Sequence, residues 1–207
     1  MTLDEYCLEH STLPCNPALE WIERQTHIRT NRARMLSGRE VGGLLAAISK
    51  MTAPRAVLEL GVFTGYATVC LASGMAAGGT IDSIEINDEL EDVIREGYDR
   101  AGISASVNLL FGDARELLPT LQRTYDLVYI DANKRQYPEY WERIVDKVRP
   151  GGVIISDNTL WDGKVTEDAH DPQSRGILAF NKMVKEDRRV ESLMLPLRDG
   201  LTISVRL

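Results

Sequence analysis

The stretch LELGVFTGYA occupies residues 58–67 and links an apolar strand pattern to an apolar helical pattern. Gly61 allows a tight backbone turn and lets a ligand approach closely. Gly65 opens the next helix, whose first amides are free to donate hydrogen bonds. The spacing Gly-x-x-x-Gly, with Glu59 two residues earlier, matches neither the G-x-G-x-x-G of nicotinamide-cofactor folds nor the phosphate-binding G-x-x-x-x-G-K loop. The stretch therefore predicts a ligand-binding turn in an α/β sheet and disfavours a dehydrogenase.

Short β-rich runs alternate with helical patterns along the rest of the chain. The predicted strands are 56–60, 80–84, 106–111, 127–130, 153–156, 190–196 and 201–205, and the predicted helices are 66–76, 88–101, 114–122, 137–148 and 175–186. Such alternation indicates parallel strands joined by right-handed helical crossovers. Asp199-Gly200 lies between the last two strands and is a strong hairpin signal. We therefore expect a doubly wound, Rossmann-like α/β sheet, mostly parallel, with an antiparallel C-terminal hairpin strand.

Composition and length are those of one ordinary globular domain spanning residues 1–207. The chain is 43% hydrophobic and 27% charged, with a net charge of −7, so it lacks the global positive field that attracts nucleic acid. Residues 1–50 look helical, with Gly42-Gly43 interrupting the pattern, and are expected to pack on the domain over one end of the sheet. The absence of a signal-peptide pattern, of a long apolar run and of metal-ligand spacing among three cysteines predicts a cytoplasmic protein without membrane contact.

Polar residues follow the second and third predicted strands. Glu85 ends the second strand, where a carboxylate can accept two hydrogen bonds from a ribose diol. Gly112-Asp113-Ala114 ends the third and suits a turn beside an adenine ring. Each piece alone is also what a satisfied turn or a helix cap looks like. Their succession after three strands favours a nucleoside-containing cofactor.

Oxygen donors follow the next two strands. Asp131 comes after the fourth strand, and Asp157 and Asn158 come after the fifth, so the three should gather at one edge of the sheet. They suit a hard cation such as Mg²⁺, Mn²⁺ or Ca²⁺, and the lack of Cys or His beside them disfavours zinc. The alternatives are turn chemistry at 157–158, a helix cap at Asp131 and a solvated surface role for Lys134. We favour the metal site because neighbouring carboxylates need a cation to remain ionised.

These segments resemble the cation-dependent O-methyltransferases of the catechol and caffeoyl-CoA type. The resemblance rests on an ordered series over residues 35–207, and its members are LELGVFTGYA, SIEIND, GDA, YIDANKRQY, DNTLW and LPLRDGLTISV. It implies a class I methyltransferase fold that uses S-adenosylmethionine (SAM) and a divalent metal, and a homodimer.

The resemblance also implies roles for single residues. The SAM site maps onto Ser37, Glu59, Gly61, Val62, Ala67, Glu85, Asp113, Ala114 and Asn133, and the metal site maps onto Asp131, Asp157 and Asn158. Lys134 occupies the position of the catalytic lysine, next to Asp131. Two departures matter: many relatives have Asp where this chain has Asn133, and the plant branch often has Asn where this chain has Asp162. The second departure weakens any transfer of the plant acyl-substrate site.

The expected chemistry is methyl transfer to a hydroxyl of a small catechol-like acceptor. A cation bound to two neighbouring hydroxyls makes them more acidic, and Lys134 takes or shuttles the proton. The segment 159–176, with hinges at Gly163 and Gly176, should flank the acceptor, where Trp161 either stacks on a ring or simply packs. Two alternatives stay open: a tRNA hydroxyuridine O-methyltransferase, suggested by basic residues between 21 and 50, and a non-catalytic SAM- or metal-binding module.

Overall fold

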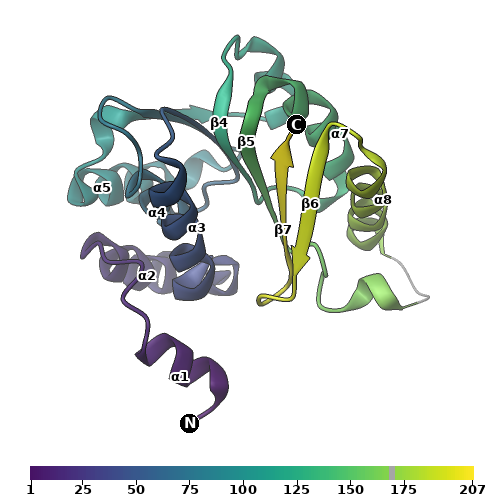
Figure 1. Ribbon diagram of the computed structural model, residues 1–207. Helices are drawn as coiled ribbons and strands as arrows, with labels where there is room; N and C mark the ends of the chain where they lie inside the picture. Colours follow the sequence, from purple (N-terminus) through teal and green to yellow (C-terminus); the bar gives the residue numbers. More distant parts are fainter. Residues whose placement is uncertain (168–170) are drawn as a thin grey trace.

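The computed structural model describes residues 1–167 and 171–207, and a seven-stranded sheet forms its centre (Figure 1). The sheet order is β3-β2-β1-β4-β5-β7-β6. Its strands are β1 Ala56–Leu60, β2 Thr80–Glu85, β3 Val107–Phe111, β4 Tyr125–Ile130, β5 Val148–Asp157, β6 Val190–Leu195 and β7 Leu201–Arg206. Neighbours among β1 to β5 are parallel, and β7 runs antiparallel to both β5 and β6. The predicted doubly wound sheet with an antiparallel C-terminal strand is confirmed.

Helices cover both faces of the sheet. The α-helices are α1 Leu3–Glu9, α2 Ala18–Arg29, α3 Gly38–Thr52, α4 Tyr66–Ala72, α5 Glu91–Ala101, α6 Ala114–Leu117, α7 Tyr137–Ile144 and α8 Pro172–Glu186. Buried residues of α2 to α5 form one cluster on one face, and those of α6 to α8 form a second cluster on the other. This two-sided cover explains why the central strands are apolar without alternation.

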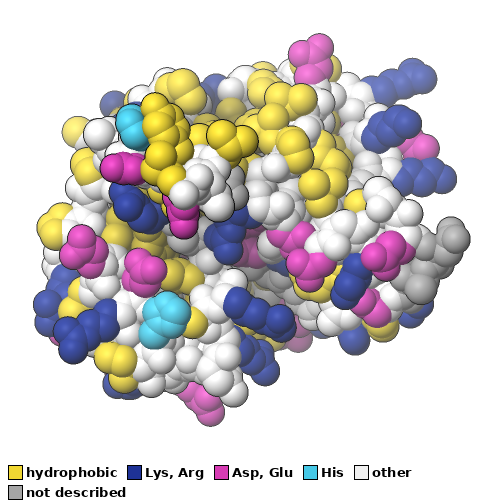
Figure 2. All heavy atoms as spheres, turned by 90° about the horizontal axis from the view of Figure 1, so that it is seen from below, with side chains coloured by type: hydrophobic (Ala, Val, Ile, Leu, Met, Phe, Trp, Pro, Cys, Tyr) yellow, Lys and Arg dark blue, Asp and Glu magenta, His cyan; other side chains and the backbone are white. Residues whose placement is uncertain are grey.

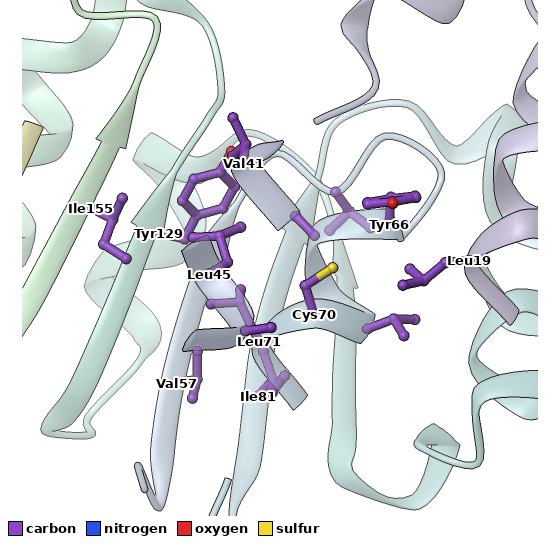
Figure 3. Packing of buried hydrophobic residues seen from close by; sticks show 14 of the residues in the cluster. Leu19, Val41, Leu45, Val57, Tyr66, Cys70, Leu71, Ile81, Tyr129 and Ile155 are labelled. Atoms are coloured by element: carbon purple, nitrogen blue, oxygen red, sulfur yellow. The ribbon is translucent and has the colours of Figure 1, made fainter. Parts of the chain in front are cut away.

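Strand β1 shows how one short segment serves both clusters. All five of its residues are buried. Val57 faces α3 and α4, together with Val41, Leu45 and Leu71 (Figure 3). Leu58 and Leu60 point the other way, into the cluster beneath α7 and α8. Because β1 is buried on both sides, the position of the loop that begins at Gly61 is well defined.

The glycine pair at 42–43 does not interrupt the first long helix, so that prediction was wrong. α3 runs unbroken through both glycines. A Cβ added at Gly42 would lie 2.8 Å from a ring carbon of Tyr66 and 2.9 Å from the Cys70 sulfur. Gly42 therefore serves the close packing of α3 on α4, and this contact could not be read from the local pattern.

Several predicted helices end early, because their last turns are short 3₁₀ segments or belong to the next strand. The predicted helix 137–148 ends at Ile144, and Val148 already pairs with Tyr125 in the sheet.

Gly176 is not a hinge, since it lies inside α8, where an added Cβ would lie 2.4 Å from the Lys134 carbonyl oxygen. The remainder of the predicted flanking segment is seen only in part, because residues 168–170 lie outside the described residues.

The N-terminal helices differ in how they meet the body. α2 and α3 pack on α5 and α4, as expected. α1 does not follow this expectation: it extends from the body in Figure 1, and its Leu3 and Tyr6 are 83% and 47% exposed. The helix has only seven residues, and so short a helix is marginal in water on its own. In the described part of the chain, no helix has the length and apolar character needed to cross a membrane.

Candidate functional site

The carboxyl ends of the parallel strands open onto a cleft of about 1550 Å³. Figure 2 looks at this end of the molecule and shows Lys and Arg side chains around a hollow. All but one of the predicted site residues line the cleft: Ser37, Gly61, Val62, Ala67, Glu85, Asp113, Ala114, Asp131, Asn133, Lys134, Asp157 and Asn158. The exception is Glu59.

The turn after β1 is held by the strands on both sides of it. Gly61 has φ +88°, and an added Cβ would lie 2.1 Å from the Asp131 carbonyl oxygen, so only glycine fits. Glu85 at the end of β2 accepts hydrogen bonds from the amides of Val62 at 2.8 Å and Phe63 at 2.7 Å. Its other oxygen accepts from the Asn87 amide at 2.9 Å. A carboxylate has about four acceptor sites, so one site remains for a ribose hydroxyl rather than the two we expected.

Glu59 lies behind this turn and is fully buried. One carboxylate oxygen accepts hydrogen bonds from the Thr68 and Ser83 hydroxyls, each at 2.7 Å, while the other has no partner. Burial raises the pKa of Glu59 to about 7, although the two hydroxyls oppose this shift. Glu59 is thus placed to support the turn from within.

A capping residue follows both β3 and β4: Asp113 caps α6, and Asn133 caps the short turn at 134–136. The Asp113 carboxylate accepts from the Arg115 amide at 2.8 Å and pairs with the Arg115 guanidinium at 2.7 Å. The side-chain hydrogen bond from Arg115 holds the pKa of Asp113 below its usual range. Asn133 caps the short turn at 134–136, so Asp131 does not serve as that cap. The Asp131 carboxylate is therefore left for the cleft.

Lys134 is not a solvated lysine, because only 7% of it is exposed. Its ammonium group donates to Asp131 Oδ1 at 2.6 Å and to the Tyr137 hydroxyl at 2.8 Å. The Tyr137 hydroxyl also lies 3.1 Å from the Ile130 carbonyl oxygen and 3.0 Å from that of Asp157. Tyr137 therefore joins the lysine to the ends of β4 and β5.

Asp157 and Asn158 stand at the end of β5 beside this group. Asp157 is 4% exposed, and its carboxylate accepts from the Tyr129 hydroxyl and the Asn158 amide, both at 2.7 Å. Burial first, and repulsion by Asp131 second, raise the pKa of Asp157 to about 6. A buried carboxylate that is repelled by a second carboxylate nearby is a group that a bound cation stabilises in its ionised form.

Sequence reasoning missed Tyr129 and Tyr137. Tyr129 looked like another apolar residue of β4. Its hydroxyl, however, donates to the carboxylate of Asp157 at the end of the neighbouring strand β5. Tyr137 lies three residues after Lys134, a spacing that brings side chains together on a helical turn. That spacing was the available signal for Tyr137, whereas Tyr129 offered none.

Comparisons with known proteins agree with this geometry. Residues 9–207 match the family model described as O-methyltransferase. The chain belongs to the O-methyltransferase family. It is 31% identical to caffeoyl-CoA O-methyltransferase 2 of Eucalyptus globulus, over 99% of this chain and 88% of that protein.

Solved structures give the same fold for this O-methyltransferase. The enzyme of Bacillus cereus, determined in complex with SAH, is 27% identical with a TM-score of 0.88, covering 99% of this chain and 97% of that chain. TomG of Streptomyces achromogenes, determined in complex with SAM and involved in tomaymycin synthesis, is 26% identical with a TM-score of 0.88, covering 100% and 99%. The sheet order and the antiparallel last strand are those of the class I methyltransferase fold.

Proposed function

We propose that this O-methyltransferase transfers the methyl group of SAM to one hydroxyl of a small acceptor with two neighbouring hydroxyls, with the help of Mg²⁺ or a similar hard cation. The observation that carries the proposal is the buried contact of Lys134 with Asp131, beside Asp157 and in the same cleft as the Gly61 turn. The relatives include a SAH-bound and a SAM-bound protein, which supports the choice of methyl donor.

The donor set fits a hard cation. Asp131, Asp157 and Asn158 would hold it through oxygen atoms. Burial and repulsion by Asp131 raise the pKa of Asp157, and a bound cation would oppose this shift. The site depends on two carboxylates and an amide, because the described residues contain no cluster of three or more His, Cys, Asp and Glu side chains that could hold a metal. When bound, such a cation supplies Lewis-acid polarisation of the acceptor oxygens.

The protein residues supply orientation and proton transfer. The Gly61 turn and Glu85 would hold the cofactor in the cleft that Asp131 and Lys134 also line, and this would bring the two reactants together. Lys134 would accept the hydroxyl proton of the acceptor through its neutral amine form, and the Tyr137 hydroxyl holds the Lys134 Nζ in position. Water exclusion follows from the burial of Lys134 and Asp157.

A polyanionic acceptor such as tRNA is less well supported. The basic residues that suggested it are Arg24, Arg29, Arg32, Arg34, Arg39 and Lys50. Only Arg29, Arg32 and Arg34 line the cleft; Arg39 lines a separate small pocket, and Lys50 lies in the last turn of α3. Positive charges that are dispersed over the surface do not form a continuous binding surface for a phosphate backbone.

A non-catalytic module is disfavoured, because burying the Lys134 ammonium beside a carboxylate has a desolvation cost that a purely structural role does not explain.

A methyl-transfer assay with labelled SAM tests the proposal. We expect turnover of catechol-type diols, little turnover of matched monophenols, and loss of activity with chelator that added Mg²⁺ restores. Undermodified tRNA is the parallel substrate. Full activity after exhaustive chelation, or equal turnover of monophenols, would contradict the proposed mechanism.

We also propose a homodimer. The edge strand β6 exposes Leu193 at 60% and Met194 at 40%, and solvent-facing apolar residues on a sheet edge favour association. Light scattering at micromolar concentration should give twice the chain mass, and a monomer throughout would refute the dimer.

A further inference from the structure

Two arginines at the mouth of the cleft have no assigned partner. Arg32 precedes the short turn Ala33–Met35 between α2 and α3, and Arg34 lies within it; both are exposed and line the cleft. Within residues 1–167 and 171–207, neither guanidinium has a hydrogen bond or an ion pair. Their neighbour Arg29, by contrast, pairs with Asp92. The two charges are therefore free to meet a ligand.

The cleft is large enough for a ligand that reaches these arginines. Pockets for one small ligand commonly measure about 300–1,000 Å³. The cleft here measures about 1550 Å³ and extends from Gly112–Ala114, past Asp157, to residues 160–166. A cofactor and an elongated acceptor can occupy it together. Met35, Trp161 and Val165 line it as well and offer apolar surface to the middle of such an acceptor.

The charges at the two ends of the acceptor region are opposite. Asp131 and Asp157 lie beside Lys134, where the hydroxyls must be for transfer. An anionic group would be repelled by these carboxylates and attracted to the guanidinium groups of Arg32 and Arg34, which are exposed and line the same cleft. Arginine binds carboxylate and phosphate in a bidentate manner, which also fixes direction. The net charge of −7 opposes a long polyanion and favours a small anion at this local site.

We propose that the methyl acceptor carries a carboxylate or phosphate group at the end opposite its hydroxyl pair, and that Arg32 and Arg34 bind this group. The inference rests on the proposed function, because it assigns the second end of the same acceptor. It makes the arginines specificity-determining residues, with no part in the chemical step.

Three matched diols test the proposal: 3,4-dihydroxycinnamate, its neutral amide, and 2-(3,4-dihydroxyphenyl)ethyl phosphate. Each is assayed for methylation and titrated by calorimetry into the enzyme with SAH and Mg²⁺. Of the carboxylate and the phosphate, we expect the one that binds more tightly to have a KM and a Kd about tenfold below those of the amide. A tenfold difference is the size of effect that one charge-assisted hydrogen bond contributes. Comparison of the carboxylate with the phosphate identifies which anion the site prefers.

The variant Arg32→Gln/Arg34→Gln should remove this tenfold preference and leave the constants of the amide nearly unchanged. Arg24→Gln is the matched control, since Arg24 is an exposed arginine of α2 outside the cleft lining. Equal weakening of amide and anions would overturn the proposal, as would an anion preference that survives the double change. Tighter, arginine-dependent binding of undermodified tRNA would overturn it in favour of RNA.

The calorimetric measurement separates this proposal from the proposed function. If no diol is methylated but the anions still bind through Arg32 and Arg34, the anion site stands and the proposed reaction fails. If diols are methylated without any anion preference, the reaction stands and the anion site fails.

Discussion

The side of the cleft that we propose for the cofactor is made of consecutive residues, whereas the side that we propose for the acceptor is assembled from segments far apart in the chain; we call them the cofactor side and the acceptor side. On the cofactor side, β1, the Gly61 turn and α4 follow one another, and Glu85 from the next strand bonds the turn. On the acceptor side, the loop after β5 depends on the hairpin between β6 and β7. Thr159 donates to the Gly200 carbonyl at 3.0 Å and Leu160 donates to that of Asp199 at 2.9 Å.

The hairpin also reaches across to the N-terminal region. Arg198 donates to the Leu36 carbonyl at 3.2 Å and to the carbonyl of Ser37. One turn thus connects the loop beside Asn158 to the start of α3. The acceptor side can therefore vary through loop contacts without altering the sheet, while the cofactor side cannot vary without altering β1.

The largest effect is expected at the proposed metal site. Asp157→Ala should abolish turnover, because the site loses one of its two carboxylates, while SAH affinity should change by less than about twofold, because the Gly61 turn is held by Glu85 and not by Asp157. Calorimetry with SAH and Mn²⁺, together with the methyl-transfer assay, measures both. Asp146→Ala, which alters exposed ion pairs far from the cleft, is the control. A parallel loss of SAH binding would show that the two sides are not separable.

Lys134→Met should lower turnover by about 10²–10⁴-fold, the usual contribution of a positioned general base. Mn²⁺ and SAH binding should persist, since Asp131, Asp157 and Asn158 remain. Lys185→Met, on an exposed part of α8, serves as the control. Single-turnover kinetics would measure the chemical step directly, and an unchanged rate there would remove Lys134 from the mechanism.

The contrast between the two sides also explains what could be predicted from sequence. The strand order, the Gly61 turn and the polar residues after β2 to β5 follow from local patterns and from the rule that ligands bind at the carboxyl ends of parallel strands. The packing role of Gly42 and the contact of Tyr129 with Asp157 depend on side chains brought together by the fold. No local pattern carries that information.

The hairpin shows the same limit. Asp199-Gly200 was predicted as a turn, which is correct, but the sequence did not show that this turn bonds the loop beside Asn158. Likewise, Glu59 was grouped with the cofactor residues by resemblance, while the structure places it behind the turn. Sequence position alone does not distinguish a residue that lines a site from one that supports it.

Glu59 provides a stability test of the cofactor side. Its pKa in the folded protein is about 7, above the ordinary value of 4.5, so the folded state binds more protons than the unfolded state between these values. Stability should therefore fall as pH rises from about 4.5 to about 7, by roughly 3 kcal/mol at most. Denaturant unfolding of Glu59→Gln across this range should show a clearly smaller decline, and an identical slope in both proteins would exclude Glu59 as its source.

The smallest effect is expected at the hairpin and concerns the acceptor side alone. The Asp199 carboxylate accepts hydrogen bonds from the Asp162 amide and the Asn158 side chain, so it holds the loop that carries a proposed metal ligand. Asp199→Ala should weaken Mn²⁺ binding and raise the acceptor KM by about tenfold, because both donors lose their partner. Asp199→Asn retains an acceptor oxygen and should recover most of that loss. The KM for SAM should stay unchanged in both variants, because the Gly61 turn is held by Glu85 and the contact of Arg198 with Ser37 is not altered by either change. Steady-state kinetics with each substrate varied in turn would decide the matter: equal increases in both KM values would mean that the hairpin supports the whole cleft and that its two sides are coupled.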